Sequence, residues 1–102
     1  MNIAILLPYK ENFTKRNAGA VSIFVNSTNR LSKYKKNIKV FGYTSYNERF
    51  KNYTNLYIEK KILFSTTNKY LNKFRTSVKN IKIDILEIHN RPNYIDFLDK
   101  NS

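Results

Sequence analysis

The chain has 102 residues, of which 41% are hydrophobic, so it holds a single domain of modest size. It contains no Cys and one His, which excludes disulfides, thiolate metal sites and cysteine nucleophiles, and we expect no essential metal or other resident cofactor. Nineteen Lys and Arg against seven Asp and Glu give a net charge of +12, but Lys outnumbers Arg fourteen to five and the basic residues are scattered, which argues against specific nucleic-acid recognition.

A strand, a helix and a second strand are predicted over the first 42 residues. Residues 2–7 form a short apolar run that Pro8 ends, which is typical of a buried parallel strand. From 19 to 34 the apolar residues recur every three or four positions, which predicts a helix with Asn17 as its N-cap. Residues 38–42 supply the second strand, so the order is that of a βαβ unit. The apolar face of the helix would contain Ala20, Val21, Phe24, Val25, Thr28 and Leu31.

The next stretch has no regular hydrophobic period. We expect a long, partly ordered connection over residues 43–56, whose aromatic side chains pack against the domain rather than stack on nucleic-acid bases. Residues 57–59 and 62–64 are apolar enough to form two short strands or edge segments. The hydrophobic pattern therefore leaves the middle of the chain least defined.

Helix and strand patterns alternate again toward the C-terminus. Ser65 or Thr66 would cap a helix that ends near Asn80, and residues 83–88 form a further β-branched run. Pro92 suits the first turn of a final helix, whose apolar residues we expect to find little to pack against. The alternation predicts an α/β fold with an open, mostly parallel Rossmann-like sheet and helices on both faces, in three layers.

Ligands of such sheets bind at the carboxyl ends of the strands, so the loop before the first helix is one candidate site. Ala18, Gly19 and Ala20 open that helix, where free backbone N–H groups and the helix dipole favour an anion such as a diphosphate. Gly19 alone is also compatible with close packing of helix on strand. Glu11 and Arg16 lie in the same loop and would line the same crevice.

The second candidate site follows the strand at residues 83–88. His89 is the single imidazole of the chain, and Glu87 lies two positions before it on the same side of the strand. Asn90 and Arg91 could hold a hydroxyl-rich or phosphorylated ligand, or could cap the helix that begins at Pro92. A purely structural hydrogen-bonding role for the imidazole remains an alternative.

With these motifs in this order, the chain resembles the N-terminal domain of family 4 glycosyltransferases of the GT-B fold. The resemblance spans nearly all of residues 1–102, and its most specific motif is the run from His89 to Pro92. Enzymes of that family face two Rossmann-like domains across a cleft, the N-terminal one mainly binding the acceptor and the C-terminal one the nucleotide-sugar. They transfer the sugar with retention and need no essential metal.

The resemblance implies roles for the candidate residues. His89 would position or polarise groups near the anomeric centre, and Asn90 and Arg91, with Glu11 and Arg16 in the other loop, would shape the acceptor side. The turn from Ala18 to Ala20 would approach the donor diphosphate, although the family's first glycine is Ala18 here. The family's donor-binding domain has no counterpart in these residues, so we expect a fragment, inactive alone, that transfers sugar to a glycan or lipid only when a partner chain supplies the rest.

Two other interpretations stay open. One is a small basic α/β module that binds nucleic acid or another polyanion through its charge, and the other is a non-functional relic. The start of the chain, residues 1–8, is too short for a signal peptide and lacks a basic n-region, and no run has the length of a membrane span, so we expect a cytoplasmic protein. The scattered lysines would allow weak contact with an anionic inner membrane surface.

Overall fold

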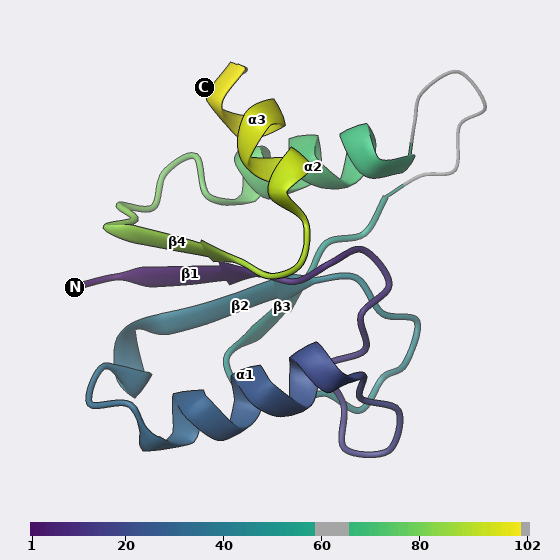
Figure 1. Ribbon diagram of the computed structural model, residues 1–102, viewed down its shortest axis with the longest axis vertical. Helices are drawn as coiled ribbons and strands as arrows, with labels where there is room; N and C mark the ends of the chain where they lie inside the picture. The colour runs from purple at the N-terminus through teal and green to yellow at the C-terminus, as the bar shows by residue number, and fades with distance from the viewer. Residues whose placement is uncertain (59–65, 101–102) are drawn as a thin grey trace.

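The computed structural model describes residues 1–58 and 66–100 and forms an α/β domain (Figure 1). Strands and helices alternate along most of the chain, as the hydrophobic pattern predicts. The elements in chain order are β1 (Ile3–Leu6), α1 (Ala20–Leu31), the short 3₁₀ helix η1 (Lys35–Asn37), β2 (Ile38–Gly42), β3 (Tyr53–Asn55), α2 (Thr66–Ser77), β4 (Ile85–Ile88) and α3 (Pro92–Lys100).

The four strands of the described residues pair in parallel, in the order β3-β2-β1-β4. Ile3 of β1 pairs with Ile38 of β2 on one side and with Ile85 of β4 on the other. This order equals the first four positions of the doubly wound order 3-2-1-4-5-6. The predicted open parallel α/β sheet is therefore confirmed, and its topology is Rossmann-like.

Helices cover both faces of the sheet, as expected. Figure 1 shows α1 on one face and α2 with α3 on the other. Alternate residues of β1 serve the two layers, because successive side chains of a strand point to opposite faces. Ile5 and Leu7 pack with Val25 of α1, whereas Ala4 and Leu6 pack toward α2 and α3.

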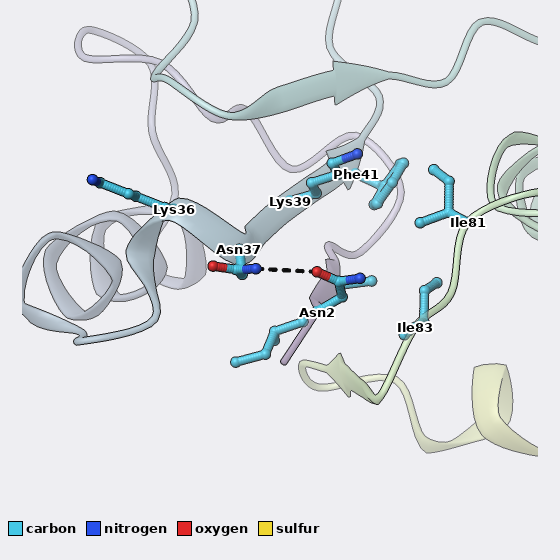
Figure 2. Close-up of a pocket in the computed structure, with 9 residues that line it drawn as sticks. Asn2, Lys36, Asn37, Lys39, Phe41, Ile81 and Ile83 are labelled. Carbon is cyan, nitrogen blue, oxygen red and sulfur yellow. Dashed lines mark hydrogen bonds between the residues drawn. The ribbon is translucent and has the colours of Figure 1, made fainter.

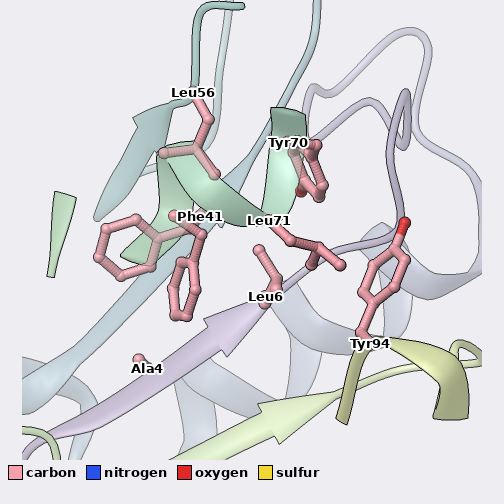
Figure 3. Packing of buried hydrophobic residues seen from close by; sticks show 8 residues of the cluster. Ala4, Leu6, Phe41, Leu56, Tyr70, Leu71 and Tyr94 are labelled. Carbon is pink, nitrogen blue, oxygen red and sulfur yellow. The ribbon is translucent and has the colours of Figure 1, made fainter. Parts of the chain in front are cut away.

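The layer between the sheet and α2/α3 is the larger of the two cores (Figure 3). Tyr70 of α2 is fully buried and its hydroxyl donates a 2.6 Å hydrogen bond to the carbonyl of Leu7. Tyr94 of α3 is 2% exposed, and its hydroxyl accepts a hydrogen bond from the backbone N–H of Tyr9. The expectation that α3 would find little to pack against is therefore wrong, since the residues before it form the surface on which it docks.

Three other predictions need correction. Residues 43–56 contain a strand, β3, because Tyr53–Asn55 pairs with the exposed edge of β2 even though its own pattern is weak. Tyr57 and Ile58 form no strand, and the predicted segment at 62–64 lies outside the described residues, as does residue 59. Of the predicted apolar face of α1, Phe24 and Leu31 are exposed, and the buried positions are Ser22 and Val25.

Among the helices of residues 1–58 and 66–100, none combines the length and apolar character needed to traverse a bilayer.

Candidate functional site

The two predicted site loops leave the sheet side by side. Leu6 and Ile88 are paired residues at the carboxyl ends of β1 and β4. The loop that begins at Pro8 and the loop that begins at His89 therefore start on neighbouring strands at one edge of the sheet. That edge is where parallel α/β folds bind their ligands.

The N-terminus of α1 is capped differently from the prediction. Gly19, and not Asn17, is the N-cap residue, and it offers no side-chain hydrogen bond. The backbone N–H of Asn17 instead donates to the hydroxyl of Thr14. The cap comes from the distant Glu11, whose Oε2 accepts a 3.2 Å hydrogen bond from the backbone N–H of Ser22 in the first turn. The prediction that Asn17 is the N-cap is wrong because α1 begins at Ala20, and the Glu11 carboxylate of the preceding loop accepts the hydrogen bond from its first turn.

Gly19 matters because the Glu11 carboxylate lies against it. A Cβ atom added at position 19 would lie 2.5 Å from Glu11 Oε2 and 2.8 Å from Oε1. The N-terminus of α1 therefore holds an anionic group of the chain itself, the Glu11 carboxylate. A ligand diphosphate would have to displace the Glu11 carboxylate in order to reach the same N–H groups.

His89 directly follows β4 at the same edge of the sheet, and its ring contacts α1. Its ring centroid is 6.0 Å from that of Phe24, in an edge-to-face arrangement. His89 Nε2 is 3.3 Å from Glu87 Oε2, as the two-residue spacing predicts, and this pair becomes an ion pair when the imidazole is protonated. The geometry of this contact is not that of a hydrogen bond. Within the described residues, His89 Nε2 is buried and has no hydrogen-bond partner. A buried nitrogen without a hydrogen-bond partner is uncommon in folded proteins.

The other predicted residues have less constrained positions. Asn90 has a positive φ of 55°, which turns the chain sharply from β4 toward α3. Arg91 is exposed, and its guanidinium donates to the carbonyl of Asn90. Arg16 is also exposed, and Ala18 is half-buried just before the cap. The structure therefore brings Glu11, Gly19 and His89 to one edge and leaves the two arginines on the surface beside it.

Sequence reasoning missed an aromatic pair at this edge. Tyr9, directly after Pro8, stacks on Tyr43, which follows β2, with ring centroids 5.2 Å apart. Both rings are half-buried, and burial together with Tyr43 raises the pKa of the Tyr9 hydroxyl above its ordinary value. Their position was the available signal: Tyr9 lies three residues after the end of β1 and Tyr43 one residue after the end of β2, and such residues meet at the carboxyl edge.

Among the described residues, a hollow of about 100 Å³ lies beside the amino-terminal end of β1. Lys36, Lys39 and Phe41 are among the residues that line it, next to a hydrogen bond from Asn37 to Asn2 (Figure 2). None of the predicted site residues lines it. In the described part of the chain, no group of three or more His, Asp or Glu side chains is placed to hold a metal ion.

No family model, curated protein or solved structure matches this chain.

Proposed function

We propose that this chain is the N-terminal, acceptor-side domain of a retaining GT-B glycosyltransferase and transfers sugar only together with a donor-binding domain. The observation that carries the proposal is His89: its buried Nε2 has no hydrogen-bond partner within the described residues, and its ring contacts Phe24 of α1. Phe24 lies five residues after Gly19, which is about 7.5 Å along a helix axis. A sugar phosphate that binds at the helix N-terminus would therefore place its sugar within reach of the imidazole.

The chemistry of the edge fits this role. Once the Glu11 carboxylate is displaced, the N–H groups of the first turn of α1 can stabilise a leaving diphosphate, since negative charge is favoured at a helix N-terminus. His89 Nε2, which lies 3.3 Å from Glu87 Oε2, can bind a sugar hydroxyl. The stacked Tyr9–Tyr43 pair offers a flat aromatic surface of the kind on which an acceptor sugar can stack.

The Glu11 carboxylate lies where the proposed donor diphosphate would bind. Binding of a diphosphate must therefore exchange one anion for another. This exchange costs affinity in the isolated domain. In the proposed complete enzyme, cationic groups of the donor-binding domain would offset that cost.

Binding of inorganic pyrophosphate, followed by isothermal titration calorimetry, tests the proposal. We expect weak binding that strengthens several-fold in Glu11→Gln, because a neutral side chain competes less well for the helix N-terminus. Gly19→Val should weaken it, because a side chain would occupy the space that the diphosphate needs. Lys79→Gln, an exposed change away from the edge, is the matched control. Equal losses in Gly19→Val and Lys79→Gln would contradict the proposal.

A further inference from the structure

Three hollows adjoin at the amino-terminal end of the sheet. The hollow of about 100 Å³ beside β1 shares Lys36 and Lys39 (Figure 2) with one of about 340 Å³ between the starts of β2 and β3 and the end of α2. Lys36 and Asn52 line both this second hollow and a third of about 600 Å³, between the end of α1, η1 and the turn before β3. Because neighbouring hollows share their walls, they form one continuous depression, which we call the amino-edge groove.

Among the residues that the structure describes, five cations and no carboxylate line this groove. The cations are Arg30, Lys35, Lys36, Lys39 and Lys51. Within the described ranges, none of them forms an ion pair. Four of the seven acidic residues of the chain lie instead in residues 84–99, which line none of the three hollows. The dipole of α1 accounts for a cation at Arg30, in its last turn, but not for those on β2 and in the turn before β3.

Hydrogen bonds hold together the segments that carry these cations. Asn52 Nδ2 donates a 3.4 Å hydrogen bond to the carbonyl of Lys35, and the carbonyl of Asn52 accepts a 2.8 Å bond from the backbone N–H of Val40. Asn37 Nδ2 donates a 3.2 Å bond to Asn2 Oδ1. These contacts fix η1, the turn before β3 and the start of β1 to one another, so the positive charges are fixed in space before any ligand binds.

We infer that the amino-edge groove binds a linear polyphosphate, a chain that carries negative charge on every unit. Cations spaced along a depression suit an extended anion better than a single phosphate, because each further phosphate that reaches a cation adds to the affinity. The amide groups of the lining Asn side chains can donate to phosphate oxygens between the cations. The inference does not rest on the proposed glycosyltransferase function, because the groove lies at the end of the sheet opposite to His89 and Gly19.

The groove suits a nucleic acid less well. Two aromatic rings line it, but Phe41 is only 3% exposed. Tyr53 already stacks on Phe13, with ring centroids 5.6 Å apart, and the guanidinium of Arg49 lies 5.8 Å from the Tyr53 ring. Neither ring is therefore placed for a base to stack on it. Four of the five cations are Lys, which bind phosphate as point charges and lack the planar fork that reads a base edge.

Isothermal titration calorimetry with three anions tests which ligand the groove accepts. Long-chain polyphosphate, inorganic pyrophosphate and single-stranded oligothymidine are compared at equal concentrations of phosphate. We expect polyphosphate to bind at least about tenfold more tightly than either of the others, since only the long chain reaches all the cations without placing bases. Pyrophosphate binding as tightly as the long chain would overturn the extended site. Oligothymidine binding as tightly as polyphosphate would overturn the choice of ligand.

The salt dependence of polyphosphate binding tests whether the groove is the site. If each cation contributes about 0.7 to the slope of log K against log salt, as for single-stranded polyanions, the slope is about −3.5 in wild type. The double change Lys36→Gln and Lys39→Gln should bring it to about −2, and Lys35→Gln with Lys51→Gln, toward the other end of the groove, should do the same.

The matched control is Lys73→Gln with Lys79→Gln, which removes the same charge from exposed positions outside the groove. We expect the control to keep the wild-type slope, and circular dichroism melts check that each variant is folded. An equal change of slope in the control and in the groove variants would overturn the inference, and so would a wild-type slope in either groove variant.

Discussion

Replacing Gly19 by Ala tests whether Glu11 is the cap of α1. The new Cβ would lie 2.5 Å from Glu11 Oε2, well inside van der Waals contact, so the carboxylate has to move away. The backbone itself is not strained by the change, because Gly19 has φ −78° and ψ 176°, a conformation that Ala adopts freely. The effect therefore isolates the loss of the carboxylate from the helix N-terminus.

The expected cost follows from the contacts that are lost. Moving Glu11 breaks its hydrogen bond to the Ser22 N–H and removes a negative charge from the first turn, which together cost about 1 to 2 kcal/mol. The lower entropy of the unfolded Ala chain returns about 0.5 kcal/mol. The net loss of about 1 kcal/mol lowers Tm by roughly 4 to 8 °C in a domain of this size.

A double-mutant cycle measured by thermal denaturation gives the decisive comparison. Glu11→Ala should cost about 1 to 2 kcal/mol alone, and adding Gly19→Ala should then cost nothing further, because no carboxylate remains to be displaced. Thr14, which caps the preceding loop at Asn17, provides a control position whose change should add normally to either variant. Simple additivity of Gly19→Ala and Glu11→Ala would refute the capping role of Glu11.

Three further outcomes follow from the same geometry. Tyr70→Phe should cost about 1 to 2 kcal/mol in urea denaturation, because it leaves the buried Leu7 carbonyl without its donor. Burial also raises the pKa of the Tyr70 hydroxyl in the folded chain, so the unfolded chain loses its phenolic proton at a lower pH. The free energy of unfolding should therefore be unaffected well below about pH 10 and fall above it, less steeply in Tyr70→Phe than in wild type. Thermal melts between neutral pH and about pH 11 measure this difference. Leu6→Ala on β1 should cost about 2 to 5 kcal/mol because its side chain is fully buried, whereas Leu31→Ala on α1 should cost less than about 0.5 kcal/mol because Leu31 is 89% exposed. Similar costs of the two changes in chemical denaturation would contradict the outward orientation of Leu31.

Strands β1, β2 and β4 were predictable because their hydrophobic patterns are local. Residues 38–42 were predicted as a strand, and β2 has those bounds. β3 was missed since Tyr53–Asn55 is short and polar, and its structure depends on pairing with β2, a contact that no local pattern encodes.

The face of α1 was harder to predict than its existence. A period of three to four residues defines an apolar stripe, but it does not say that the helix turns Leu31 and Phe24 outward and buries Ser22 instead. The side that is buried depends on how the helix axis sits on β1 and β2, which is a tertiary property. The exposed stripe became visible only once that placement was known.

Contacts of the candidate site were predictable where the two residues lie close together in the sequence. The approach of Glu87 to His89 follows from the two-residue repeat of a strand. The capping of α1 by Glu11 spans eleven residues of irregular loop to Ser22, and no spacing rule anticipates it. The absence of a capping side chain at Gly19 and of acidic residues in the first turn was the available hint.

The most direct test of the proposed function uses the single imidazole of the chain. Addition of a nucleotide-sugar or inorganic pyrophosphate is followed by NMR at the His89 ring and at the backbone amides of Ala20 to Ser22. The account predicts that these signals shift together and saturably, and that Gly19→Val abolishes the shifts of the amides. Shifts confined to the lysines at 35 and 36, with the His89 ring unchanged, would contradict it.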